Sequence, residues 1–117
     1  RSKPLMLPQQ KVQYHLLLCA SPTKPLCHQG PLGAQCWEQL KKSLKAAGLE
    51  QPEREEGVVL RTKADCLRLC SNGPVLLVWP SGHYYGELTP KRIERIVAQH
   101  LINGEPITEW LIKQNSF

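Results

Sequence analysis

The sequence predicts an α/β fold with a mixed central sheet and helices packed on it. Three observations lead to this prediction: the elements follow in the order strand, helix, strand, strand, strand, helix, the strands are short and apolar, and the helices are amphipathic. A chain of 117 residues has the usual size of one domain with one core. We place that domain at residues 14–104, between an N-terminal tail (1–13) and a C-terminal tail (105–117).

The first predicted strand covers residues 14–19, a short aromatic and aliphatic stretch. Residues 20–33 follow with three prolines and two glycines, so we expect a loop there, and this loop carries Cys27. From residue 34 apolar side chains recur at helical spacing, and Gly48 is a natural end for a helix. The segment between them therefore predicts an amphipathic helix.

The middle of the chain predicts two further strands and a hairpin. Residues 58–60 form a short apolar run, and a strand there that is parallel to the first one would require a right-handed crossover through the helix. Residues 74–79 are continuously apolar, as expected for a strand that is covered on both faces. Residues 80–83 predict a tight turn, and 84–85 begin the returning strand.

The last helix has a clear start. Thr89 is a suitable N-cap and Pro90 a suitable first helical residue, and the apolar face continues until Gly104. In the tail that follows, Ile107 and Trp110 either pack back on the sheet or contact another subunit, and the sequence leaves both options open.

Composition limits where the protein acts. The longest uncharged apolar runs, at 16–18 and 75–79, are far too short to cross a bilayer. Residues 1–10 are basic, contain two prolines and lack the apolar core of a secretory signal. An odd number of cysteines argues for a reducing compartment and against a disulfide framework. We therefore expect a cytoplasmic protein that binds no membrane.

The cysteines, at positions 19, 27, 36, 66 and 70, indicate a metal site. Cys66 and Cys70 are separated by three residues and precede a turn-forming segment at 71–74. This spacing lets both sulfurs aim at one point while backbone N–H groups turn inward, as iron-bound thiolates require. Zinc is an alternative, although its ligands usually come as two tight pairs and only one such pair is present here. Buried thiols with an incidental pair are the other alternative.

The cysteine pattern, taken with its flanks, resembles the thioredoxin-like 2Fe-2S ferredoxin family, in particular its cyanobacterial type. The resemblance covers roughly residues 14–110 and is most specific at 61–70. The other matching segments are Leu18-Cys19-Ala20, Lys24-Pro25-Leu26-Cys27, Asn72-Gly73-Pro74, Trp79-Pro80-Ser81-Gly82, His83-Tyr84-Tyr85, Thr89-Pro90 and His100-Leu101-Ile102-Asn103-Gly104. The predicted order of elements is also that of the thioredoxin-like class, which has helices on both faces of its sheet.

The resemblance implies a 2Fe-2S cluster held by four cysteines, two in the loop after the first strand and two before a Gly-Pro turn. In this chain these are Cys19, Cys27, Cys66 and Cys70. Cys36 is the open alternative for the second position. It lies at the start of an amphipathic helix, where a cysteine is most often a small buried hydrophobe, so we favour Cys27.

The function implied by such a cluster is that of a low-potential one-electron carrier, near the plant-type value of roughly −400 mV. An enzyme is not expected, because no nucleophile and base pair or nucleotide loop accompanies the cysteines. A redox-sensing or electron-relay subunit of a larger assembly and a zinc-stabilised interaction domain are the alternatives. His28, beside Cys27, is taken as a solvated loop residue, and the other three histidines are taken as structural.

The net charge of +5 bears on the partner. An oxidised cluster with four thiolates adds about −2, so part of the excess offsets the cofactor. The remainder favours an acidic redox partner, and Lys24, Lys63 and Arg68 lie near the ligands, where they could screen the cluster or guide that partner. Nucleic acid is not expected, because the charges are scattered with few aromatic residues between them. Some relatives dimerise, and Trp110 offers a contact for a homodimer.

Overall fold

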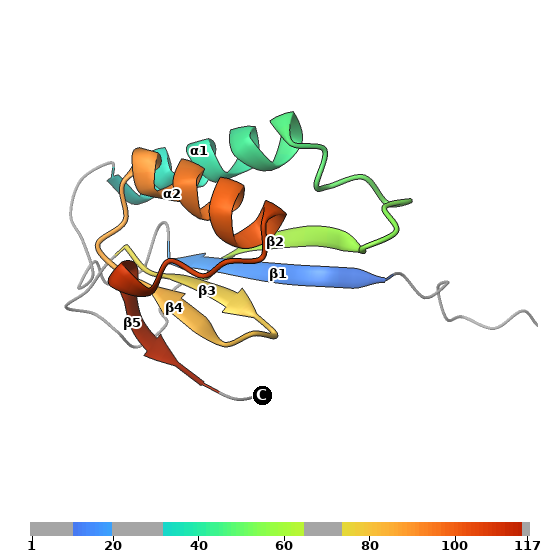
Figure 1. The fold of residues 1–117 in the computed structure, drawn as a ribbon. Coiled ribbons are helices and arrows are strands. Elements are labelled where there is room, and N and C mark those ends of the chain that lie inside the picture. Colours follow the sequence, from blue (N-terminus) through green and yellow to red (C-terminus); the bar gives the residue numbers. More distant parts are fainter. Residues whose placement is uncertain (1–10, 20–31, 65–73, 116–117) are drawn as a thin grey trace, which may run out of the picture.

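A five-stranded mixed sheet forms one layer of the molecule (Figure 1). The computed structural model describes residues 11–19, 32–64 and 74–115. The strands are β1 (Val12–Cys19), β2 (Val58–Ala64), β3 (Leu76–Trp79), β4 (His83–Tyr85) and β5 (Leu111–Gln114). They lie in the order β2-β1-β3-β4-β5, with β1 and β2 parallel and the other neighbours antiparallel. The predicted mixed sheet is confirmed.

Helix α1 (Leu32–Ala46) connects the two parallel strands. Cys36, Leu40 and Leu44 recur every four residues on its buried face, as the helical pattern predicted. The helix begins two residues before the predicted start and ends just before Gly48.

Helix α2 (Pro90–Ile96) continues into a π-helical turn, η2 (Val97–Ile102). The hydroxyl oxygen of Thr89 accepts a hydrogen bond from the backbone N of Arg92 at 3.2 Å, so Thr89 is the N-cap, as predicted. Pro90 occupies the first turn, where the absence of its N–H costs nothing. Among the described residues, no helix is both long and apolar enough to traverse a bilayer.

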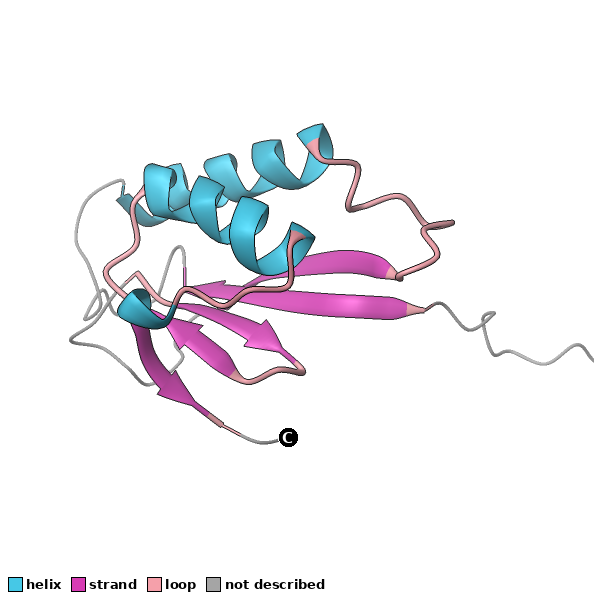
Figure 2. Ribbon diagram, viewed as in Figure 1, coloured by secondary structure: helices cyan, strands magenta, loops and turns pink. Residues whose placement is uncertain are grey.

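Both helices lie on one face of the sheet, where α1 and α2 run side by side (Figures 1 and 2). The thioredoxin-like class predicted helices on both faces, and the described part of the chain places none on the opposite face. The helices share one face because the apolar stripe of each packs on the same layer of strand side chains.

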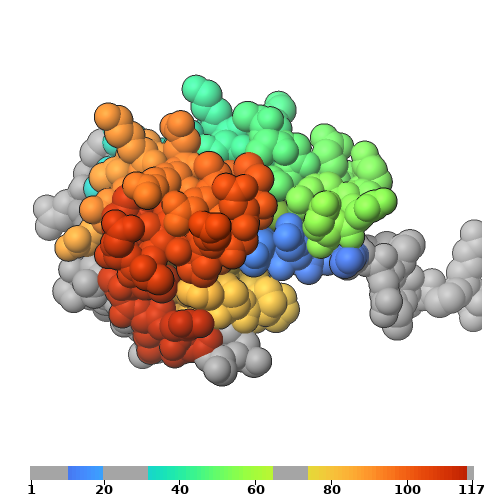
Figure 3. All heavy atoms as spheres, in the orientation of Figure 1, coloured from blue at the N-terminus to red at the C-terminus, as the bar shows by residue number. Residues whose placement is uncertain are grey.

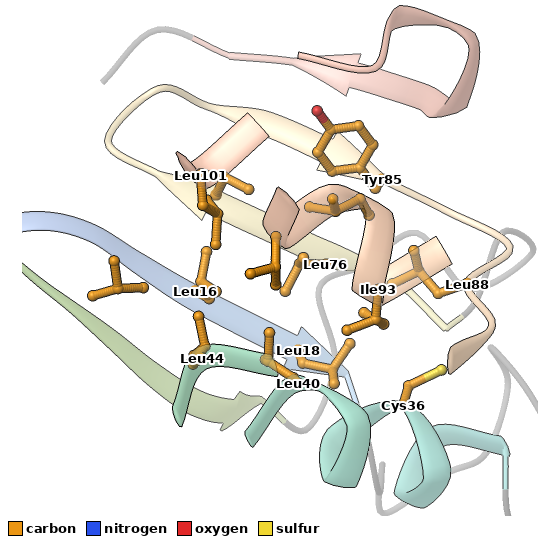
Figure 4. Close-up of a cluster of buried hydrophobic side chains, with 14 of the residues drawn as sticks. Leu16, Leu18, Cys36, Leu40, Leu44, Leu76, Tyr85, Leu88, Ile93 and Leu101 are labelled. Atoms are coloured by element: carbon orange, nitrogen blue, oxygen red, sulfur yellow. The ribbon is translucent and has the colours of Figure 1, made fainter. Parts of the chain in front are cut away.

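The hydrophobic core fills the space between this helix layer and the sheet (Figure 4). Leu16 and Leu18 of β1 alternate with residues that point to the other face, so they reach the helices. They meet Leu40 from α1 and Ile93 from α2, and all four side chains are fully buried. The core therefore joins the first strand to both helices.

The C-terminal segment belongs to the folded unit and extends it beyond the predicted limit at residue 104. Ile107 is 1% exposed and lies in the core, Trp110 and Leu111 pack against it, and β5 pairs with β4. In the space-filling view this segment is continuous with α2 (Figure 3). Of the two options that the sequence left open, Ile107 and Trp110 thus pack on their own chain. Burial of Ile107 and the hydrogen bonds of β5 are the physical reason.

A buried hydrogen-bond network ties β4 to this segment. The hydroxyl of Tyr85 accepts from the backbone N of Ile107 at 3.0 Å and lies 2.7 Å from Nδ1 of His100. The hydroxyl has a proton to donate and a second lone pair to accept with, so it can partner Nδ1 of His100 in either tautomer of the neutral ring. Burial, and secondarily the neighbouring His83, lower the pKa of His100 to about 4.

The network predicts that stability falls in mild acid. The pKa of His100 is about 6.5 in the unfolded chain and about 4 in the folded protein, so the unfolded state binds the proton first. The stabilisation of the folded state by neutral His100 is complete above pH 6.5 and is lost as the pH falls towards 4. We expect a loss of about 2 to 3 kcal/mol between about pH 7 and about pH 4.5, measured by urea unfolding. The variant His100→Gln keeps a hydrogen-bond acceptor but does not titrate, so its free energy of unfolding should fall clearly less over the same pH range. An equal fall would contradict the assignment of the acid sensitivity to His100.

A second prediction concerns the turn between β3 and β4. Gly82 has φ of 79°, and a Cβ atom there would overlap the carbonyl oxygen of Asn115, next to β5. Gly82→Ala should therefore cost more than the roughly 1–2 kcal/mol of left-handed strain, because it also displaces Asn115. Gly104→Ala is the control, since Gly104 has φ of 74° and an added methyl group would meet no atom within 4 Å. Equal losses of unfolding free energy for the two variants would contradict the close approach of Asn115 to Gly82.

Candidate functional site

Cys19 occupies the last position of β1 and is fully buried. Its backbone N donates to the carbonyl oxygen of Val75 at 3.0 Å, and its Cα is paired in register with Ala64 of β2. The main chain at Cys19 is therefore held from both sides. This fixes the position of the Cα atom from which the side chain and its sulfur extend.

The other three predicted ligands, Cys27, Cys66 and Cys70, lie in ranges 20–31 and 65–73, outside the described residues. Within the ranges that the structure does describe, no three His, Cys, Asp or Glu side chains gather in a way that would hold a metal ion. Of the predicted ligand set, the structure thus places Cys19 alone.

The ends of the segment that carries the cysteine pair lie beside Cys19. Ala64 is the last described residue before 65–73 and pairs with Cys19, and Val75, two residues after the segment, accepts the hydrogen bond from Cys19. Pro74 is held in turn, because its carbonyl oxygen accepts from the backbone N of Leu88 at 3.3 Å. Two separate parts of the sequence that contain predicted ligands therefore meet at the carboxyl end of β1.

Cys36 is placed differently. It is fully buried in the hydrophobic core, among the side chains drawn in Figure 4, and burial raises the pKa of its thiol to about 11. A thiol with this pKa stays protonated at neutral pH in the metal-free protein. Cys36 therefore has the environment of a small core hydrophobe.

The two described cysteines also belong to opposite faces of the sheet. Leu16 and Leu18 point into the core beneath the helices, and side chains alternate along a strand, so Cys19 points to the other face. Cys36, by contrast, reaches the core from α1. The two sulfurs therefore start from opposite sides of the sheet.

The described histidines have structural partners. The ring of His15 lies 2.7 Å from the hydroxyl of Thr62, and Nδ1 of His83 lies 2.8 Å from the hydroxyl of Ser81. His100 belongs to the buried network with Tyr85. These contacts agree with the structural roles that the sequence suggested for them. His28 lies outside the described residues.

The structure adds a feature that the sequence did not predict, in which cations lie over tryptophan rings. Arg61 and Lys63 lie over the ring of Trp37, and Arg92 and Arg95 lie over Trp110. For Arg61 and Lys63 the sequence did contain a signal, because residues two apart on a strand point to the same face. The sequence alone did not show which aromatic ring they cover.

Comparison with known proteins gives a consistent result. No protein-family model matches the chain. A 2Fe-2S ferredoxin of Aquifex aeolicus is 27% identical over 103 residues, covering 86% of this chain and 89% of that protein. A 2Fe-2S ferredoxin of Clostridium pasteurianum is 26% identical over 98 residues, covering 81% of this chain and 91% of that protein.

Solved structures show the same fold. A thioredoxin-like 2Fe-2S ferredoxin from Aquifex aeolicus superimposes with a TM-score of 0.71 at 24% identity, covering 89% of this chain and 94% of that chain. A structure of the wild-type ferredoxin gives a TM-score of 0.64 at 26% identity, covering 86% and 97%. The fold of this chain is thioredoxin-like, and in sequence the chain is similar to 2Fe-2S ferredoxins at about 27% identity.

Proposed function

We propose that this chain is a one-electron carrier that holds a 2Fe-2S cluster through Cys19, Cys27, Cys66 and Cys70. The similarity to 2Fe-2S ferredoxins extends over most of the chain, and ferredoxins are electron-transfer proteins. The position of Cys19 carries the proposal, because this buried residue lies between the two ends of the segment that contains the cysteine pair. Seven residues separate Cys19 from Cys27, a spacing that we assign to the cyanobacterial type.

The donor set fits such a cluster. Four thiolates are the usual ligands of a 2Fe-2S centre. Cys19 offers a sulfur whose main chain is already fixed by two neighbouring strands, so little conformational entropy is lost when it binds iron. Cys36 is committed to the core as a protonated thiol, which supports Cys27 as the second ligand from the first loop.

The chain's own residues have three tasks in electron transfer. When bound, the cluster supplies a centre that takes up and releases one electron. The strand pairing holds Cys19 in place, its burial excludes water from one side of the site, and Lys63 brings a positive charge to the neighbouring strand end. With four thiolate ligands we propose a low potential, near roughly −400 mV. We also propose that the protein acts in the reducing environment of the cytoplasm.

Reconstitution tests the proposal. Anaerobic treatment of the protein with ferrous iron and sulfide should yield a coloured protein with equal amounts of iron and acid-labile sulfide, because both are parts of the cluster. Metal analysis and the visible spectrum are the measurements. A colourless product that binds zinc in place of iron would instead support the zinc-stabilised interaction domain.

The second ligand is tested by a matched pair of alanine variants. Cys27→Ala should lose the cluster or alter its visible spectrum, because it removes a ligand. Cys36→Ala should keep the spectrum and lower the free energy of unfolding by about 1 kcal/mol, because it removes only a buried sulfur. The opposite outcome, with the cluster retained in Cys27→Ala and lost in Cys36→Ala, would reverse the assignment.

A further inference from the structure

The positive charge of the chain is concentrated in three elements. Helices α1 and α2 and strand β2 carry eight Lys or Arg side chains against two Glu, so the rest of the chain holds a net charge of −1 out of an overall +5. The eight cations are Lys41, Lys42, Lys45, Arg61, Lys63, Lys91, Arg92 and Arg95. This asymmetry gives the molecule a basic side.

Among the described residues, part of this charge is paired with carboxylates and part is not. Arg61 forms an ion pair with Glu50 at 2.9 Å, and Lys41 forms one with Glu38 at 2.9 Å. Lys63 is exposed, and over the described ranges no carboxylate lies within ion-pair distance of it. Within the same ranges this also holds for Arg92.

Three of the cations, Lys63, Arg92 and Arg95, are held against tryptophan rings. Nζ of Lys63 lies 5.4 Å from the ring centroid of Trp37, a side chain that is only 8% exposed. The guanidinium carbons of Arg92 and Arg95 lie 4.7 and 5.3 Å from the ring centroid of Trp110. A cation that rests on a ring has fewer rotamers to lose when a partner binds, so its contact with the partner is favoured.

Both groups lie at the end of the sheet where β1 ends in Cys19. Lys63 precedes Ala64, the register partner of Cys19. Arg92 is in the first turn of α2, and Figure 1 shows the start of α2 and the start of β5 at this same end. We call the surface formed by Lys63, Lys91, Arg92 and Arg95 the cationic end.

The spacing of the two groups suits one interface. The outer strands β2 and β5 are separated by β1, β3 and β4, so they lie roughly 19 Å apart when neighbouring strands are about 4.8 Å apart. A standard interface of about 800 Å² per partner is roughly 30 Å across. One partner can therefore contact both groups and cover the strand end with Cys19 between them.

We propose that the cationic end docks an acidic redox protein, an inference that rests on the proposed function. Charge complementarity names the partner class, since carboxylates on its surface would pair with cations that have no carboxylate partner in the described part of this chain. Nucleic acid fits less well, because base stacking needs open rings and both tryptophans are covered by cations. Docking here would bring the partner next to the strand end that carries Cys19.

The test uses the reconstituted full chain and cytochrome b5, an acidic haem protein that accepts one electron. Binding is measured by surface plasmon resonance at low and at moderate ionic strength, and electron transfer is followed separately by stopped-flow absorbance. The test variant is Lys63→Glu with Arg92→Glu. The control is Lys11→Glu with Lys45→Glu, which changes the net charge equally at positions before the start of β1 and in the last turn of α1, both away from the cationic end.

We expect the test variant to bind at least about tenfold more weakly at low ionic strength and the control to stay within about threefold of the unmodified chain. Equal weakening in both variants, no weakening in either, or tighter binding to duplex DNA than to cytochrome b5 at the same ionic strength would overturn the proposal. Specific binding without electron transfer would keep the docking surface and reject the carrier function. If the test variant transfers electrons as fast as the unmodified chain, the docking surface would be rejected and the carrier function kept.

Discussion

The pairing of Cys19 with two neighbouring strands is the constraint on which the rest of the site depends. Strand β1 lies between β2 and β3, so the backbone of Cys19 is paired with Ala64 on one side and hydrogen-bonded to Val75 on the other. These contacts bring both ends of segment 65–73 to the residue from which the first loop departs. The backbone pairing of the strands can therefore bring together proposed ligands that are far apart in the sequence. Their side chains need not contact one another for this. The strand pairing offsets the entropy that is lost when the two ends of segment 65–73 are held together.

The site and the core are separated by the sheet itself. Leu16 and Leu18 face the helices, and Cys19, as the next residue, faces away from them, while Cys36 lies within the core. The thiol of Cys36 is neutral because it is buried there and its pKa is raised, whereas the proposed role of Cys19 as a ligand requires a thiolate. As a consequence, substitutions in the core should change stability with little direct effect on the sulfur of Cys19, and ligand substitutions should do the opposite.

The sequence predicted those features that depend on local patterns. The N-cap at Thr89, the amphipathic α1 and the short apolar strands follow from periodicity and capping, and the structure has all of them. It did not predict β5, because a four-residue strand pairs through its backbone and leaves little pattern, and it left open whether Ile107 is buried. The shared face of both helices, and the hydrogen bond between Tyr85 and His100, depend on contacts between distant residues, which spacing along the chain does not reveal. For the site, the sequence identified Cys36 as a core residue, and the whole set of four ligands, Cys19 included, stays a prediction.

The central claim is that four sulfurs gather around a pair of irons at the carboxyl end of β1, and electron paramagnetic resonance of the dithionite-reduced, reconstituted protein tests it most directly. We predict the spin one-half signal of a single electron shared by two coupled irons. A high-spin signal from one isolated iron before reduction, or the absence of any signal after it, would contradict this claim.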